Sequence, residues 1–404
     1  MFLFNSHPDH RRPLEPAEAE TLGGEGTDQV ERFLVFRGSS EPTPLLALPA
    51  LAAELGVGAI HVKDEGGRLG LGSFKALGGA YAVARLALEE AARHLGRSVE
   101  LTEIPTPAVR DITSQMTFAC ATDGNHGRSV AQGARFVGAE SVVFTHAGVS
   151  AERVAAIARF GARMVRVEGS YDQSVAEAAE VSAREGWIVV SDTSWPGYDR
   201  IPGLVMQGYT VMAREALRQL AEPPTHVFIQ AGVGGVAAAI AAHMALMLGD
   251  ARPRFIVVEP TRAACLFETA KAGHPVKLTP GESTVMAMLE CHEPSLTAWR
   301  VLCRAADAFM TINEGEAIAV MNRLARPLGE DPIIVAGESG GVGLGGLMRA
   351  VADPGARAAL GLEAASRIFV INTEGATDPD RYAELVGDHP EALLEIERAR
   401  KLAS

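Results

Sequence analysis

The sequence predicts an α/β protein of two lobes, each with a mainly parallel sheet flanked by helices. Short apolar segments alternate with helical patterns in two series, one before and one after a turn-rich stretch at residues 194–203. The candidate strands are nearly continuous apolar runs, which is typical of sheets covered on both faces. A chain of 404 residues also exceeds what one compact core usually accommodates. We therefore expect two lobes in one chain.

The composition predicts a soluble, cytoplasmic protein that acts on a small metabolite. The net charge is −13 without a basic cluster, which argues against a nucleic-acid partner. No uncharged apolar run approaches the roughly 18 residues that suggest a membrane span, and the first residues lack the order of a secretory signal. The four cysteines form no CxxC pair, so we expect no metal site. A reducing cytosol also argues against a disulfide between Cys265 and Cys291.

The first part of the chain is expected to begin irregularly and then to become regular. Residues 1–40 mix proline, glycine and acidic residues, so we predict no regular structure there. The segment LLALPALAAELG predicts a helix ending at Gly56, a short strand is predicted over Ala59–Lys63, and Ala80–Leu95 has a strongly helical composition. Residues 99–114 contain two prolines and little periodicity, which predicts a loop-rich insertion.

Strands and helices then alternate in the two series. The first series has candidate strands at TFACAT, SVVFTH, RMVRVEG and WIVVSD, with helices through Phe136 and over Ala151–Phe160 and Asp172–Glu185. The second has candidate strands at THVFIQ, RFIVVEP, PIIVAGE and RIFVINT, with helices over Gly235–Met247 and Gly341–Ala352. Residues 194–203 are rich in turn formers and separate the two series, so we interpret them as a hinge.

Lys75 stands at the centre of the stretch LGLGSFKALGGAY. Between Leu69 and Leu88 the only charged residues are Lys75 and Arg85, and glycines bracket the lysine. Desolvation of an ammonium favours the neutral amine, which is a nucleophile. Such an amine forms a Schiff base with an aldehyde, including that of pyridoxal 5'-phosphate (PLP). The alternative for Lys75 is a solvated surface charge without chemistry.

A second group of polar side chains follows the strand TFACAT, in the segment ATDGNHGR. In open α/β sheets ligands bind at the carboxyl ends of the strands, so Asn125 is a candidate to hydrogen-bond a cofactor and Asp123 a candidate base. Asp and Asn are also favoured helix N-caps, so a structural role for this pair stays open. We expect His126 to be structural.

A glycine-rich loop follows the strand THVFIQ. Its residues Gly232–Gly235 lead into a helix, and backbone N–H groups at such a place suit a phosphate. The loop also satisfies G-x-G-x-x-A, with Glu259 ending a later strand, so a dinucleotide-binding oxidoreductase is a competing interpretation. That competitor leaves Lys75 and Asn125 without a role.

Two further loops follow strands of the second series. The segment ESGGVGLGG over Glu338–Gly346 is another glycine-rich strand-to-helix loop, and Thr373 offers a neutral hydroxyl after the last strand. A hydroxyl facing a pyridine nitrogen would leave that nitrogen unprotonated, which tempers the electron-sink strength of PLP. A helix or turn cap is the alternative role for Thr373.

In this order, the motifs resemble those of the fold-type II PLP enzymes, the family of threonine dehydratases and serine racemases, over residues 40–380. GSFK resembles the family's Schiff-base motif and implies that Lys75, with Phe74 before it, holds PLP. GNH implies that Asn125 contacts the ring hydroxyl, and GVGG implies a phosphate cradle of Gly232, Val233, Gly234 and Gly235. The family's tryptophan synthase β-like architecture implies PLP in a cleft between a large PLP-binding domain (1–72 and 202–404) and a small domain (73–201).

Within this family, the segments TDGNHGR and SDTSWPGYDRIPGL resemble those of the diaminopropionate ammonia-lyases. The resemblance implies α,β-elimination of D- and L-2,3-diaminopropionate to pyruvate and two ammonia. Lys75 would take the α-proton of the L substrate and Asp123 that of the D substrate, Tyr171 and Asp192 would contact the substrate, and Thr373 would face the pyridine nitrogen. It also implies a homodimer. A serine or threonine dehydratase is the nearest alternative, and an NAD-binding oxidoreductase is a more distant one.

Overall fold

The computed structural model describes residues 1–122, 124–169 and 171–403, and the contacts within it divide the chain into two compact units. The first unit comprises Met1–Gly24, Pro42–Gly67 and Met212–Ser404, and the second comprises Glu25–Glu41 and Arg68–Val211. Residues 25–41 thus belong with the unit that holds most of the predicted small domain. The division into a large PLP-binding domain and a small domain stays a prediction.

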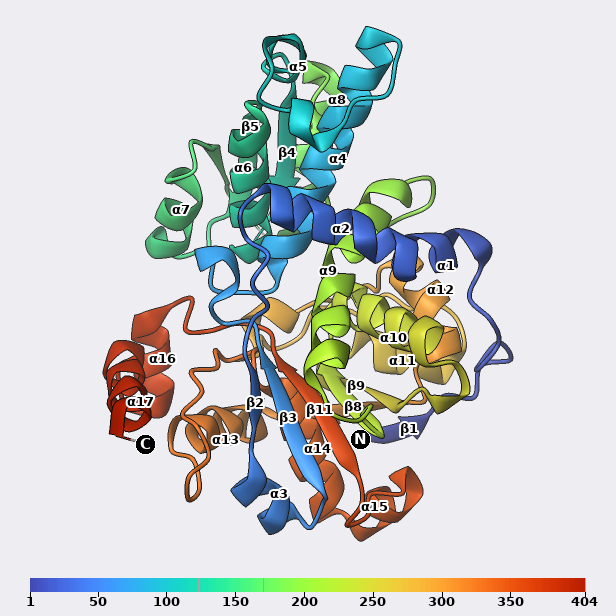
Figure 1. The fold of residues 1–404 in the computed structure, drawn as a ribbon, viewed down its shortest axis with the longest axis vertical. Helices are drawn as coiled ribbons and strands as arrows, with labels where there is room; N and C mark the ends of the chain where they lie inside the picture. Colours follow the sequence, from blue (N-terminus) through green and yellow to red (C-terminus); the bar gives the residue numbers. More distant parts are fainter. Residues whose placement is uncertain (123, 170, 404) are drawn as a thin grey trace. The chain divides into compact units, whose positions relative to one another are not determined.

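The first unit is built on a seven-stranded sheet, counted over its described residues, in the order β1-β10-β9-β8-β11-β3-β2 (Figure 1). The strands are β1 (Phe2–Phe4), β2 (Leu45–Ala47), β3 (Ala59–Asp64), β8 (His226–Gln230), β9 (Arg254–Pro260), β10 (Ala308–Ile312) and β11 (Arg367–Asn372). The strands from β10 to β3 pair in parallel, whereas β1 and β2 pair antiparallel at the two edges. Every residue of β8 and β10 is buried, as expected for a sheet covered on both faces.

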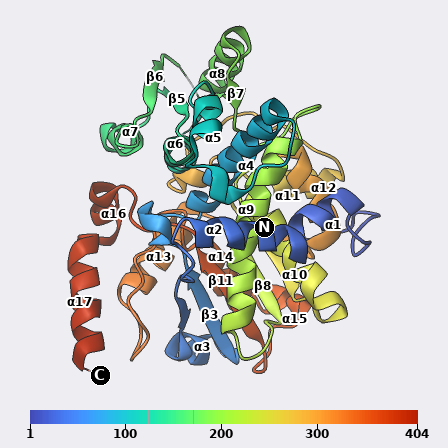
Figure 2. The ribbon, with the colours of Figure 1, turned by 45° about the horizontal axis from the view of Figure 1, so that its top comes forward.

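Helices cover this sheet. They are α1 (Pro16–Leu22), α3 (Pro49–Leu55), α10 (Gly235–Leu248), α11 (Cys265–Ala272), α12 (Leu296–Ala305), α13 (Glu314–Ala325), α14 (Val342–Ala352), α15 (Pro354–Leu360), α16 (Pro379–Val386) and α17 (Pro390–Ala403), with short 3₁₀ turns at Gly249–Ala251 and Ala287–Leu289. The C-terminal helices α16 and α17 lie near α13 (Figure 2), where Tyr382, Val386 and Leu393 share a buried cluster with Met321.

The second unit is built on a four-stranded parallel sheet, counted over its described residues, in the order β6-β5-β4-β7. Its strands are β4 (Thr117–Ala121), β5 (Glu140–His146), β6 (Arg163–Val167) and β7 (Ile188–Val189). Its helices are α2 (Gly24–Phe36), α4 (Lys75–Leu95), α5 (Pro107–Thr113), α6 (Asn125–Val137), α7 (Ala151–Ala158), α8 (Tyr171–Glu185) and α9 (Arg200–Gln219), with 3₁₀ turns at Arg68–Gly70 and Leu101–Glu103, and α9 continues into the first unit. The α/β class with mainly parallel, helix-flanked sheets is confirmed.

The prediction that residues 1–40 are irregular is wrong, because this segment forms β1, α1 and α2 through contacts with distant residues. Phe2 pairs with Met310 in the antiparallel edge of the sheet. The Asn5 side chain donates hydrogen bonds to backbone carbonyls, including that of Ala306 at 2.8 Å. These partners lie about 300 positions away in the sequence. A local sequence pattern therefore cannot predict the pairing.

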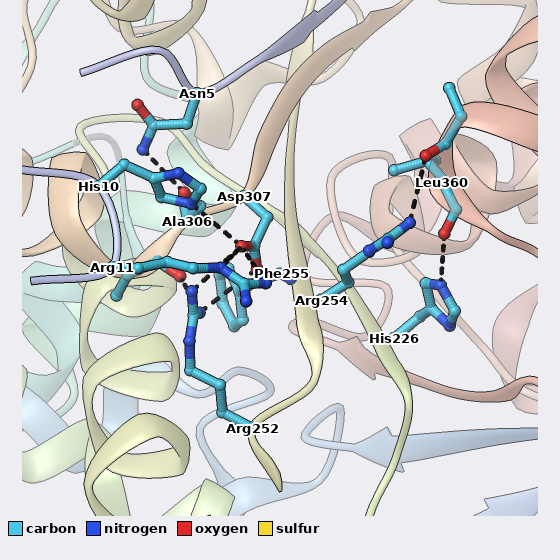
Figure 3. Close-up of polar contacts among 12 residues, drawn as sticks. Asn5, His10, Arg11, His226, Arg252, Arg254, Phe255, Ala306, Asp307 and Leu360 are labelled. Carbon is cyan, nitrogen blue, oxygen red and sulfur yellow. Dashed lines mark hydrogen bonds and ion pairs between the residues drawn. The ribbon is translucent and has the colours of Figure 1, made fainter. Parts of the chain in front are cut away.

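Asp307 binds two side chains of the same N-terminal segment, within the first unit (Figure 3). Its carboxylate lies 3.0 Å from His10 Nε2 and 3.0 Å from Arg11 Nη2, and Arg252 Nη2 approaches at 3.1 Å. The backbone N–H of Phe255 donates to the same carboxylate at 2.9 Å. Burial acts to raise the pKa of Asp307, but the arginines and this hydrogen bond outweigh it, so its pKa is lowered.

Three other expectations need correction. Residues 332–338 (PIIVAGE) form no strand, and the Ile333 N–H donates to the Glu397 carboxylate at 3.0 Å instead. The sheet instead contains β10, between β1 and β9, and this strand was not predicted. An apolar run shows burial but does not distinguish a strand from a buried loop.

Two segments before residue 115 also differ from the prediction. The predicted helix before Gly56 divides into β2 and α3, because Pro49 starts the helix. Residues 99–114 contain α5 as well as loops.

Smaller differences concern element ends. The helix predicted over Ala80–Leu95 begins at Lys75, β7 is only two residues long, and α9 begins at Arg200, inside the predicted hinge. No helix in the described part of the chain is long and apolar enough to cross a membrane.

Candidate active site

Lys75 is the first residue of α4, in the second unit. Its ammonium forms an ion pair and a hydrogen bond with the Asp192 carboxylate, and its Nζ lies 5.6 Å from the centroid of the Phe74 ring. The two paired side chains are 22 % and 16 % exposed, so the pair is largely withdrawn from water. The neighbours of Lys75 in the sequence are small and apolar, and its charged partner Asp192 lies 117 positions away in the chain.

The Asp192 carboxyl is held in its ionised form. Burial acts to raise its pKa, but the charge of the Lys75 ammonium and its hydrogen bond outweigh burial, so the pKa lies below its usual range. Burial lowers the pKa of His126, and its Nε2 lies 2.8 Å from the Val190 carbonyl oxygen. A neutral imidazole that donates from Nε2 satisfies this contact.

The glycines after Lys75 allow two helices to approach the first turn of α4. A Cβ at Gly78 would lie 2.6 Å from Cε1 of Tyr209, a residue of α9, and a Cβ at Gly79 would lie 2.8 Å from the Ser129 hydroxyl oxygen on α6. The Ser129 Oγ also accepts a hydrogen bond from the Ala80 N–H at 2.9 Å. Glycine is therefore required here by packing, and Tyr209 and Ser129 were not singled out in the sequence.

Asn125 is the first residue of α6 and is buried. The N-cap position belongs to Gly124, which has φ +152°, so the N-cap alternative does not apply to Asn125. The Thr122 hydroxyl accepts hydrogen bonds from the N–H groups of Gly124 and Gly127, at 3.1 and 3.2 Å, and thereby shapes the loop. The predicted base Asp123 lies outside the described residues.

The predicted substrate contact Tyr171 begins α8, but its side chain lies outside what the structure describes. Among the predicted catalytic and substrate-binding residues, the structure therefore brings Lys75 and Asp192 together in the second unit.

The glycine loop of the first unit runs from β8 into α10. Gly234 is the N-cap residue of α10 with φ +100°, and no side chain caps this helix. A Cβ at Gly232 would lie 2.9 Å from the Cys291 sulfur, and a Cβ at Gly234 would lie 3.1–3.2 Å from three apolar side chains. Uncapped backbone N–H groups at the start of a 14-residue helix suit a phosphate, as the sequence predicted for Gly232, Val233, Gly234 and Gly235.

Thr373 directly follows β11, which pairs in parallel with β8. The carboxyl ends of these two strands therefore meet at one edge of the sheet, where ligands bind in open α/β folds. The Thr373 side chain is buried, and its Oγ1 accepts a hydrogen bond from Gln230 Nε2 at 2.8 Å. Gln230 was not singled out in the sequence, because a glutamine at the end of an apolar strand carries no pattern of its own.

The described residues of each unit include chemical groups that suit PLP. The second unit offers the Lys75 amine, and its Ser73 Oγ and His126 Nδ1 are buried without a hydrogen-bond partner in the described chain. The first unit offers an uncapped glycine loop and the Thr373 hydroxyl. No three His, Cys, Asp or Glu side chains among the described residues are grouped to hold a metal ion. Among the described residues, Cys265 and Cys291 form no disulfide.

Comparison with known proteins agrees with this chemistry. Residues 37–374 match the family model described as "Pyridoxal-phosphate dependent enzyme". Diaminopropionate ammonia-lyase of Escherichia coli K12 is 39 % identical over 358 residues, which cover 87 % of this chain and 89 % of that protein. The crystal structure of the E. coli holoenzyme has a TM-score of 0.86 and 34 % identity, with 96 % of each chain covered. The E. coli enzyme in complex with an aminoacrylate–PLP azomethine reaction intermediate has a TM-score of 0.84 and 35 % identity, again with 96 % of each chain covered. The chain therefore belongs to the diaminopropionate ammonia-lyase family of PLP-dependent enzymes.

Proposed function

We propose that this protein catalyses the PLP-dependent elimination of ammonia from D- and L-2,3-diaminopropionate. With one water, the overall reaction gives pyruvate and two ammonia. The observation that carries the proposal is the Lys75–Asp192 ion pair at the start of α4, in a chain that is 39 % identical over 358 residues to a diaminopropionate ammonia-lyase. The aminoacrylate complex of the E. coli relative supports an elimination, because an aminoacrylate is what the loss of a β-substituent leaves.

Several residues would hold the cofactor. When bound, PLP supplies an electron sink that stabilises negative charge at Cα of an amino acid. Lys75 would hold its aldehyde carbon covalently through the amine, next to Phe74. Asn125 would contact the ring hydroxyl, the N–H groups of Gly232–Gly235 would bind the phosphate, and the Thr373 hydroxyl would face the pyridine nitrogen. These assignments follow the family's motifs, and the burial of Asn125 and the uncapped helix α10 support them.

Proton transfer at Cα would be divided between two bases. Lys75 would remove the Cα proton of the L substrate once its amine is released, and Asp123 would remove that of the D substrate from the opposite face. Asp192 and Tyr171 would contact the substrate. An ionised Asp192 suits this role because diaminopropionate carries cationic amino groups, and the contact with Lys75 supports an ionised Asp192.

The alternatives differ in their support. The family match over residues 37–374 favours PLP over a dinucleotide at the Gly232 loop. A serine or threonine dehydratase uses the same cofactor, so only the substrate separates it from the proposed activity. Assays with diaminopropionate, serine and threonine decide between them, and faster turnover of serine or threonine than of either diaminopropionate enantiomer would favour the dehydratase.

The direct test begins with borohydride reduction of the purified holoenzyme, followed by peptide mass spectrometry. We expect a pyridoxyl adduct on Lys75. The visible absorption of the bound cofactor is then recorded before and after addition of D- and L-diaminopropionate, while pyruvate and ammonia are measured. A cofactor adduct elsewhere, or the absence of pyruvate with both enantiomers, would refute the proposal.

We further propose that the protein is a cytoplasmic homodimer, in which residues 1–72 and 202–404 form a large PLP-binding domain and residues 73–201 form a small domain that also contributes residues to the cofactor site. The family resemblance supports the dimer and the domain roles. Light scattering after size-exclusion chromatography tests the oligomeric state, and fractionation of cells tests the location. A monomeric mass or recovery outside the cytoplasm would refute the respective statement.

A further inference from the structure

The buried amide of Gln230 joins three segments of the first unit. Its Oε1 accepts a hydrogen bond from the Gly343 N–H at 3.1 Å, and its Nε2 donates to Thr373 Oγ1 at 2.8 Å, to the Ile371 carbonyl at 3.1 Å and to the Gly340 carbonyl. The Gly343 N–H can only donate and the two carbonyls can only accept, and the Gly340 carbonyl also accepts from the Thr373 N–H at 3.1 Å. These backbone groups fix which end of the amide faces which segment, so the NH₂ group faces Thr373.

This orientation determines the role of the Thr373 hydroxyl. Because Gln230 can only donate toward it, Thr373 Oγ1 accepts that hydrogen bond and its own proton must be donated elsewhere. In the described chain that proton has no acceptor. A ligand with a lone pair would satisfy it, whereas a ligand N–H at the same position would leave a buried O–H without a partner.

The glycine-rich loop over Glu338–Gly346 permits this arrangement. A Cβ at Gly343 would lie 2.4 Å from the Phe228 carbonyl oxygen and 2.9 Å from Gln230 Oε1. A Cβ at Gly340 would lie 2.3 Å from the Glu374 carbonyl oxygen. Only glycine lets the loop approach the ends of β8 and β11 this closely, which gives this sequence motif a physical function.

We propose that Gln230 is a positioning residue that holds the Thr373 hydroxyl as a hydrogen-bond donor toward the pyridine nitrogen of PLP and so keeps that nitrogen unprotonated. The inference rests on the proposed function, because it takes Thr373 as the partner of the pyridine nitrogen. Gln230 would thereby limit the electron-sink strength of the cofactor through the Thr373 hydroxyl.

The test replaces Gln230 by Met, which has a similar volume and no amide. In Q230M the Thr373 hydroxyl loses the hydrogen bond from Gln230 Nε2 that makes it an acceptor, so its proton is no longer directed toward the ring nitrogen. We expect the ¹⁵N chemical shift of ¹⁵N-pyridine-labelled PLP bound to Q230M to move away from the wild-type value and toward that of T373V. We also expect kcat to fall about tenfold, with a change in KM below about twofold.

A double-mutant cycle separates this role from a general structural one. If Gln230 acts through the hydroxyl, Q230M changes neither the ¹⁵N shift nor kcat in a T373V background. The matched control is Q219M, because Gln219 accepts from Lys63 Nζ at 2.9 Å and donates to the Thr43 carbonyl at 3.0 Å. We expect Q219M to lower stability while leaving the ¹⁵N shift unchanged.

Two results would overturn the inference. One is a ¹⁵N shift in PLP-bound Q230M that equals the wild-type value. The other is a Q230M effect on the ¹⁵N shift that is as large in the T373V background as in the wild-type background. Should Q230M fail to fold by circular dichroism, Q230E replaces it. The carboxylate introduced by Q230E would accept the Thr373 proton when ionised, so the ¹⁵N shift of Q230E should change with pH, and a shift independent of pH from 6 to 9 would overturn the inference equally. A wild-type protein without PLP on Lys75 would refute the proposed function itself, which is a different outcome.

Discussion

The Tyr209 ring lies against Gly78 so closely that a Cβ at Gly78 would be 2.6 Å from Tyr209 Cε1 and 2.7 Å from Cζ. The same ring packs edge-on to Phe74, with 4.8 Å between the ring centroids. Phe74 precedes Lys75, and Gly78 lies one helical turn after it. Tyr209 therefore supports the start of α4 from both sides of the lysine.

We predict that G78A destabilises the protein and disturbs Lys75. The added methyl group meets a buried ring and the Val205 carbonyl, so we expect a loss of about 1–3 kcal/mol in the free energy of unfolding, together with weaker PLP binding. Urea unfolding and a PLP titration measure the two effects. The matched control is G203A on α9, where a Cβ meets nothing within 4 Å and helix propensity predicts a gain of up to about 1 kcal/mol. Equal effects of the two substitutions would contradict the packing argument.

We predict that K75A abolishes turnover and the visible absorption of covalently bound PLP together. Without the amine no covalent attachment forms, and the base for the L substrate is lost. The control K271A removes an exposed lysine, paired with Glu268 at 3.1 Å, and should retain activity. Turnover retained by K75A would overturn the assignment of this lysine.

We predict that D123N impairs the reaction of D-diaminopropionate far more than that of the L enantiomer. The amide cannot accept the Cα proton, whereas Lys75 still serves the L substrate. General-base loss typically costs about 10²–10⁴-fold in rate, so we expect kcat/KM for the D substrate to fall by at least about a hundredfold. Equal losses for both enantiomers would refute the assignment of separate bases.

We predict that stability decreases with rising pH because of Glu259. This carboxyl is fully buried and accepts hydrogen bonds from the N–H groups of Leu266 and Phe267 at 2.8 and 2.7 Å. Burial raises its pKa to about 8. Between the unfolded pKa, about 4.5, and about 8, the folded state holds a proton that the unfolded state has lost, so its contribution falls across this window.

Replacing Glu259 by Gln removes the titration. We expect the stability of E259Q relative to the wild type to rise from pH 5 to pH 8 and then to level off, as measured by urea unfolding. A constant difference between the two proteins across this range would show that Glu259 titrates normally.

We predict that D307N loosens the N-terminal segment. The amide leaves the largely buried Arg252 without its negative partner, and loss of one member of a buried ion pair costs about 3–5 kcal/mol. Because the pKa of Asp307 is lowered, its contribution is present above its unfolded pKa and is lost as the pH falls through the folded pKa. Limited proteolysis should therefore cut within residues 1–24 sooner in D307N.

The control for this prediction is D9N. Asp9 pairs with the exposed Arg12 at 3.0 Å and only at 3.6 Å with Arg304, so we expect D9N to cost less than about 1 kcal/mol in the free energy of unfolding. Unchanged cleavage in D307N, or faster cleavage in D9N, would contradict a fastening role for Asp307.

The sequence by itself determined the α/β class and many of the helices and strands, because the burial of parallel strands and the periodicity of helices are local patterns. It also marked the glycine loops, since close approach of a backbone requires glycine. Motifs of a few residues each allowed candidate site residues to be proposed, namely Lys75, Asn125, Gly232–Gly235 and Thr373, and their roles stay predictions.

Only the tertiary structure decided which side chains meet. Lys75 and Asp192 are 117 positions apart, and Gln230 and Thr373 are 143 positions apart. The strand β10 and the regular structure of residues 1–36 also depend on distant partners, such as the pairing of Phe2 with Met310. A hydrogen bond or ion pair between distant residues leaves no periodicity or spacing in the chain. It forms because the fold brings a donor and an acceptor together where water is excluded, and there each polar group must find a partner.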